Sequence, residues 1–158
     1  MRGKVPLPLI TTDFAPERVQ GMAKKIDLDT AVRIIDAAKR KAGEIKVAMN
    51  IAVVDEGNNL VAFERMDGAW LGSINIAMNK AYTARAFNME TKTLAPLCQP
   101  GQPLFGIHAS NDGRLIIFPG GIPLKDGGAV IGAIGVSGST VTDDQAVAAA
   151  GVAALEKL

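Results

Sequence analysis

Cysteine, histidine and aromatic residues are all scarce in this chain. Its 158 residues include one cysteine, Cys98, one histidine, His108, and an aromatic fraction of only 4%. A single cysteine excludes an internal disulfide framework. One histidine and one cysteine cannot assemble the usual zinc ligand set, so we expect no metal site of that type. The shortage of aromatic rings argues against a surface on which nucleic-acid bases stack.

An excess of one charge sign is also missing. Seventeen lysines and arginines face sixteen aspartates and glutamates, a formal net charge of +1. Nucleic-acid binders carry a basic excess on one face, so we expect no nucleic-acid partner. No apolar run approaches the roughly 18 residues of a membrane-spanning helix, and prolines interrupt the short apolar stretch at the N-terminus. We therefore expect a cytoplasmic protein without a membrane partner.

The chain is long enough for one domain, with 48% hydrophobic residues to fill its core. Residues 1–26 contain Pro6, Pro8 and Pro16 and show no hydrophobic period, which predicts an N-terminal arm. The domain proper is expected to span residues 27–158.

Hydrophobic periodicity predicts an order of helix, hairpin, helix, three strands and helix. Helices are expected at residues 28–41, 69–87 and 143–158, and strands at 46–54, 60–66, 114–118, 121–125 and 129–137. Thr142 and Gln145 have the spacing of a capping box for the last helix. This order predicts an α/β (α+β) fold in which a five-stranded antiparallel sheet has helices on both faces.

Arg65, Asp67 and Trp70 form the most distinctive polar group. Arg65 and Asp67 alternate onto the same strand face where a strand leads into a helix. Arg65 is suited to hold a carboxylate, and Trp70 to supply an apolar wall. The alternative is a structural salt bridge beside a core tryptophan.

Two further side chains are candidates for chemistry. Lys80 lies among alanines and methionines, so it is either a surface lysine with a buried stem or a desolvated amine with a lowered pKa. His108 follows a loop rich in proline and glycine and is suited to bind haem iron, a proton or a polar ligand. Asp143 and Asp144 at a helix start favour the helix dipole, a structural role. The segment 135–139 predicts close backbone packing, with amides able to bind an anion.

Five stretches together resemble the GlcG/HbpS-type family, which includes the C-terminal domain of PduO-type corrinoid adenosyltransferases. They are Asn50-Ile51-Ala52-Val53-Val54-Asp55-Glu56-Gly57-Asn58, Arg65-Met66-Asp67, Asn79-Lys80-Ala81-Tyr82-Thr83-Ala84, Phe118-Pro119-Gly120-Gly121-Ile122-Pro123-Leu124 and Gly132-Ala133-Ile134-Gly135-Val136-Ser137-Gly138. The resemblance runs from about Asp27 to the C-terminus. It implies a profilin-like fold with a central five-stranded antiparallel sheet and a homo-oligomer, often a tetramer or octamer.

The same resemblance implies haem as a cofactor, because some members bind haem, and small-aldehyde sensing as another role. Haem-binding members use His or Thr near the iron. This chain has no histidine before His108, so His108 and Thr83 are its candidate ligands.

Three functions remain open at this point. The first is a non-enzymatic protein that binds or senses haem, a small aldehyde or a hydroxy acid through Arg65, Asp67, Trp70, Lys80, Thr83 and His108. The second is an isomerase, lyase or hydrolase acting on a small metabolite, with Asp67 or His108 as the general base. The third is an oligomeric scaffold for neighbouring enzymes.

Overall fold

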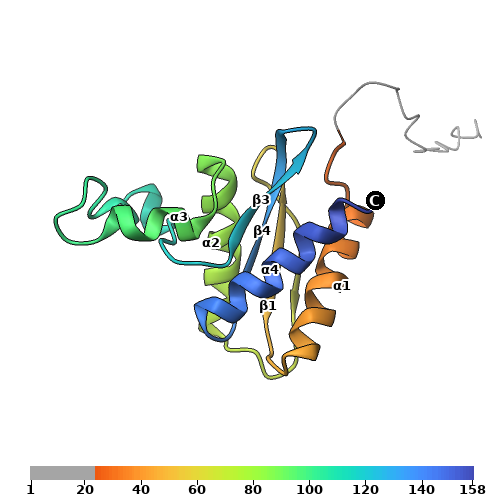
Figure 1. The fold of residues 1–158 in the computed structure, drawn as a ribbon. Coiled ribbons are helices and arrows are strands. Elements are labelled where there is room, and N and C mark those ends of the chain that lie inside the picture. The colour runs from red at the N-terminus through yellow and green to blue at the C-terminus, as the bar shows by residue number, and fades with distance from the viewer. Residues whose placement is uncertain (1–23) are drawn as a thin grey trace, which may run out of the picture.

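The computed structural model describes residues 24–158, drawn in colour in Figure 1. The predicted arm of residues 1–26 therefore lies almost entirely outside the described residues. At the start of the described chain, Ile26 is buried and the Lys24 backbone N–H donates to Asp126.

Four strands form one antiparallel sheet. They are β1 (Asn50–Asp55), β2 (Leu60–Arg65), β3 (Gly121–Asp126) and β4 (Ala129–Ser137), in the spatial order β2-β1-β4-β3. The predicted α/β fold, an antiparallel sheet with helices on both faces, is confirmed. Among residues 24–158, however, the sheet has four strands and not five. The first predicted strand is also shorter than expected, because residues 46–49 precede β1.

The predicted strand at residues 114–118 is the one that does not form. Its backbone is held by a helix side chain instead: the Ile116 N–H donates to the Thr83 hydroxyl at 3.0 Å, and that hydroxyl also lies 3.4 Å from the Arg114 carbonyl. Pro119 then follows and has no N–H to donate to a ladder. An apolar run of this length resembles a buried strand, and only packing against the helix distinguishes the two.

Three long helices cover the two faces of the sheet (Figure 1). α1 (Leu28–Glu44) and α4 (Val141–Leu155) pack together on one face over the larger apolar core. α2 (Gly72–Phe87) covers the other face, over a small cluster built mainly from alanines. A Cβ at Gly151 of α4 would collide with Ile134 and press on Ile34, so glycine allows α4 to pack closely on α1 and the sheet.

The last helix begins differently from the prediction. Its N-cap is Thr140, whose hydroxyl accepts from the Asp143 N–H at 3.2 Å, so the capping box of Thr142 and Gln145 is wrong. Gln145 instead joins two loops, because its side chain accepts from the Gly120 N–H and donates to Glu90. α1 follows the expected pattern, with Asp27 as its N-cap.

A segment of short helices projects from the body beside α2 (Figure 1). It contains α3 (Thr91–Leu94) and three 3-10 turns, η1 (Ala95–Cys98), η2 (Ile107–Ala109) and η3 (Asn111–Gly113). The Arg114 guanidinium stacks on the Tyr82 ring at 3.7 Å, and the Tyr82 hydroxyl is 3.2 Å from Asn111. These contacts tie the projection to the middle of α2. Within residues 24–158, no helix has the length and apolarity required to cross a membrane.

The close approach of α2 to β4 depends on Gly135. A Cβ at this position would collide with the backbone of Ala77 and Ala81. We expect Gly135→Ala to lower the free energy of unfolding by about 1–3 kcal/mol or more, the usual cost of overpacking. Gly43→Ala is the matched control, because a Cβ at Gly43 in α1 meets nothing within 4 Å. That change should be neutral or stabilising by about 0.5–1 kcal/mol. Urea unfolding of both variants tests this, and equal midpoints would contradict it.

Candidate functional site

A buried ion pair joins α2 to the start of α4. The Lys80 ammonium lies 2.6 Å from the Asp144 carboxylate and donates to the Val136 carbonyl at 2.8 Å. The Phe118 ring is 4.9 Å from the same nitrogen. Lys80 is 0% exposed and Asp144 is 2% exposed. The interpretation of Lys80 as a surface lysine is therefore wrong, and the desolvated amine is the reading that fits.

The Asp144 carboxylate is bound by backbone as well as by lysine. Its second oxygen accepts from the N–H groups of Gly138 and Ser139, at 3.1 and 3.2 Å. The predicted anion-binding amides of segment 135–139 thus bind an anion that the chain itself supplies. This confirms the structural role expected for Asp144, and Asp143 likewise accepts from the Ser139 hydroxyl at 2.8 Å.

Burial acts against both charges of the pair. It lowers the pKa of Lys80, while the attraction of Asp144 acts in the opposite direction. It also raises the pKa of Asp144, while Lys80 and the two backbone N–H groups act to lower it. Each charge is tolerated in the interior only because the other is present.

The loop Pro119-Gly120-Gly121 closes over this pair. Gly120 has a φ of 118°, a region that favours glycine. A Cβ there would lie 2.6 Å from the Val136 carbonyl oxygen and 2.7 Å from the Lys80 nitrogen. Glycine at position 120 therefore leaves space for the Lys80 side chain. The ammonium group is fully enclosed and has no room for a ligand.

Arg65 is the last residue of β2, and Asp67 and Trp70 lie on the connection that leads from it to α2. Trp70 is 65% exposed, so the alternative of a core tryptophan is wrong. Arg65 is also exposed, and its Nε donates to the Ala69 carbonyl at 3.1 Å. Its terminal nitrogens are in no ion pair among residues 24–158, which leaves the predicted carboxylate contact unfilled by this part of the chain.

The register of the sheet adds two residues that the sequence analysis missed. Asn50 of β1 is paired directly with Arg65 of β2 and with Ser137 of β4. Paired residues share a face, and Ala52, two residues along β1, faces α2. The row Arg65–Asn50–Ser137 therefore lies beneath the start of α2. An asparagine inside an apolar strand run was the signal available in the sequence.

Thr83 is fully buried in α2 and its hydroxyl is occupied. It donates to the Asn79 carbonyl at 2.7 Å and accepts from the Ile116 N–H. His108, in contrast, is exposed on the projection, where Phe105 nearby in sequence is 62% exposed. Tyr82, ten residues into α2, anchors this projection, so roughly 15 Å of helix separates the anchor from the Arg65–Trp70 end. Within residues 24–158 of one protomer, His108 is not brought together with Arg65, Asp67 and Trp70.

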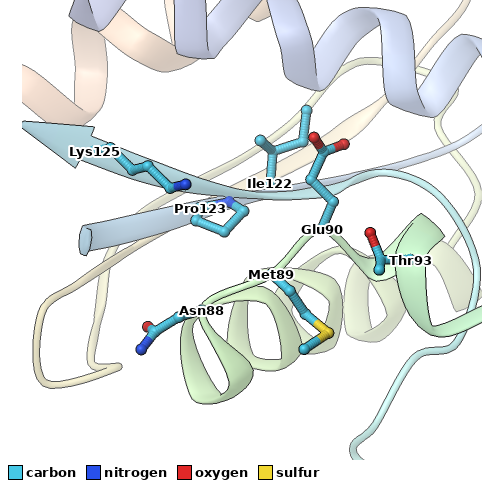
Figure 2. A pocket seen from close by; sticks show the side chains of 7 residues that line it. All are labelled: Asn88, Met89, Glu90, Thr93, Ile122, Pro123 and Lys125. Carbon is cyan, nitrogen blue, oxygen red and sulfur yellow. The ribbon is translucent and has the colours of Figure 1, made fainter. Parts of the chain in front are cut away.

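An open pocket of about 400 Å³ lies between the end of α2 and the edge strand β3 (Figure 2). Its lining includes Asn88, Met89, Glu90, Pro123 and Lys125. Glu90 is already engaged by Lys92 and Gln145. None of the predicted ligand residues lines this pocket.

The buried pair predicts strong non-additivity between two substitutions. We expect Lys80→Met or Asp144→Leu alone to lower the free energy of unfolding by about 3–5 kcal/mol, because each leaves an unpaired buried charge. The double variant should recover part of that loss, because it removes both charges but leaves the Gly138 and Ser139 N–H groups without their acceptor. Urea unfolding of all four proteins measures the coupling. Additive losses would show that the two side chains do not act as a pair.

The comparisons with known proteins agree with this fold. Residues 26–153 match the family described as haem degrading protein HbpS-like. An uncharacterized 15.0 kDa protein of Citrobacter freundii, from the dhaT-dhaS intergenic region, is 42% identical over 123 residues, which are 78% of this chain and 87% of the relative.

Two solved structures share the fold at clear sequence identity. The Klebsiella pneumoniae protein ORFY is 38% identical with a TM-score of 0.84, covering 90% of this chain and 99% of its own. The PduOC:haem complex is 30% identical with a TM-score of 0.80, covering 83% and 95%. The family match spans nearly all the described residues, and the solved structures share the fold of this chain. The chain belongs to the HbpS-like family, within the GlcG/HbpS group that its motifs resemble.

Proposed function

We propose that this chain is a non-enzymatic small-ligand-binding protein, and that haem is the first ligand to test. The observation that carries the proposal is that reactive polar groups in the interior are already hydrogen-bonded, whereas a histidine on the surface is accessible. The interior polar groups that offer chemistry, Lys80, Asp144 and Thr83, are all engaged with one another or with backbone. The imidazole of His108 is exposed. A structural relative at 30% identity is a complex with haem.

The residues that fit haem are on the projection. His108 offers an accessible nitrogen donor, the usual protein ligand to haem iron. Phe105 and Leu97 are exposed apolar side chains of the same segment, suited to contact a porphyrin face. Thr83 does not fit as an iron ligand in this conformation, because its buried hydroxyl already makes two backbone hydrogen bonds. When bound, haem supplies a redox-active iron, and His108 holds it at the surface.

A haem titration of the purified full-length chain tests this proposal. We expect the wild-type protein to give a saturable shift of the Soret band, and His108→Ala to weaken binding at least about tenfold through loss of the donor. Gln102→Ala is the matched control, because Gln102 is an exposed residue of the same projection and its loss keeps both the imidazole and the contacts with Tyr82. Equal titration curves for wild type and His108→Ala would rule out His108 as the ligand.

A small hydroxy acid or aldehyde is the second candidate ligand, placed at Arg65, Asp67 and Trp70. Its support is the exposed guanidinium beside an exposed tryptophan, which suits a carboxylate and an apolar group respectively. We propose that Lys80 and Thr83 support these sites through the fold and do not contact the ligand.

We also propose a homo-oligomer, a tetramer or octamer, that works in the cytoplasm. Exposed Phe105, Leu97 and Leu71 supply apolar surface of the kind found between subunits. Light scattering on the full-length protein after size-exclusion chromatography should give four or eight times the monomer mass of 16.5 kDa. Phe105→Ser should shift the distribution toward smaller species. A monomer at micromolar concentration would contradict the assembly.

A further inference from the structure

An unsatisfied buried acceptor lies at the end of the sheet where α2 begins. Asn50 is 0% exposed, and its side-chain nitrogen donates to the Trp70 carbonyl at 3.0 Å. Its side-chain oxygen accepts no hydrogen bond from any of residues 24–158. Leaving a buried acceptor unpaired costs about as much as a lost hydrogen bond. The acceptor is therefore a position where a donor from outside the chain is favoured.

Two positive features lie beside Asn50: the Arg65 side chain and the N-terminus of α2. Arg65 is the direct cross-strand partner of Asn50 and uses only its Nε, toward Ala69. α2 has no side-chain cap at its N-terminus and no acidic residue in its first turn, so the positive end of its dipole is not neutralised there. Two buried hydroxyl residues complete the setting, Ser73 in the first turn of α2 and Ser137 opposite Asn50.

We propose that this end of the sheet binds a small carboxylate that carries a hydroxyl group beside the carboxyl. The carboxylate pairs with the terminal nitrogens of Arg65, in the two-pronged geometry that guanidinium groups favour. The hydroxyl donates to the free oxygen of Asn50. This inference rests on the second candidate ligand proposed above, and it is independent of haem and His108.

Entry of a ligand requires a local movement, because Asn50 is fully buried. The Asn50 oxygen is enclosed, and Arg65 is tethered on the neighbouring strand by a single hydrogen bond to Ala69. The proposal requires that this bond opens on binding, so that the guanidinium turns toward the carboxylate.

Trp70 provides the readout. It is the only tryptophan of the chain, and its carbonyl is bonded to Asn50. The probes are lactate and propionate, which differ by one hydroxyl. Titrating full-length protein should change the tryptophan fluorescence, with lactate binding about tenfold or more tightly than propionate. Arg65→Gln should weaken both ligands by about tenfold or more. Arg40→Gln, an exposed arginine of α1, is the control and should change neither.

Asn50→Leu should remove the preference for lactate while propionate still binds. If that variant does not fold, the comparison of the two ligands on wild-type protein still tests the hydroxyl contact. Equal affinities of wild-type protein for lactate and propionate would overturn the proposed contact between the hydroxyl and Asn50, while the carboxylate site at Arg65 would stand. No binding of either probe, or full binding by Arg65→Gln, would overturn both. His108→Ala should leave these titrations unchanged, which separates this inference from the haem proposal.

Discussion

The Lys80–Asp144 ion pair is the constraint around which this fold is arranged. Three segments distant in sequence meet on it: α2 supplies the ammonium, α4 the carboxylate, and β4 the carbonyl of Val136. Because burial disfavours both charges, the pair forms only when helices on opposite faces of the sheet are correctly placed. An apolar pair would leave the Val136 carbonyl and the Gly138 and Ser139 N–H groups without these partners, so the pair and its backbone partners fix the three segments together.

The glycines of the chain follow from the same constraint. Gly120 leaves space for the Lys80 ammonium, and Gly138 donates its N–H to the Asp144 carboxylate. Gly135 allows α2 to approach β4 closely, which brings Lys80 within reach of Asp144. The candidate ligand residues lie away from this pair, at two places along α2. One end carries the row Arg65–Asn50–Ser137, and the projection attached farther along carries His108.

Some of the candidate site was predictable because it depends on local spacing. Arg65 and Asp67 precede a helix in the sequence, and the exposure of Trp70 excludes the alternative of a core tryptophan. Asn50 was missed because its partners belong to other strands, and only the register of the sheet aligns it with Arg65 and Ser137. The proximity of His108 to that group was expected from loop composition, which carries no information on which part of α2 the loop meets.

Local properties of the sequence, its hydrophobic periodicity and its turn residues, determined the long helices and the strands of the two hairpins. They also determined the class of fold, α/β with an antiparallel sheet. The number of strands and the environment of Lys80 were decided by tertiary structure. The run at residues 114–118 has the composition of a strand, yet its backbone bonds to Thr83 on α2. A lysine among alanines and methionines is compatible with a surface position as well as with an interior one. Lys80 can be buried because the fold places Asp144, 64 residues later in the chain, beside its ammonium group.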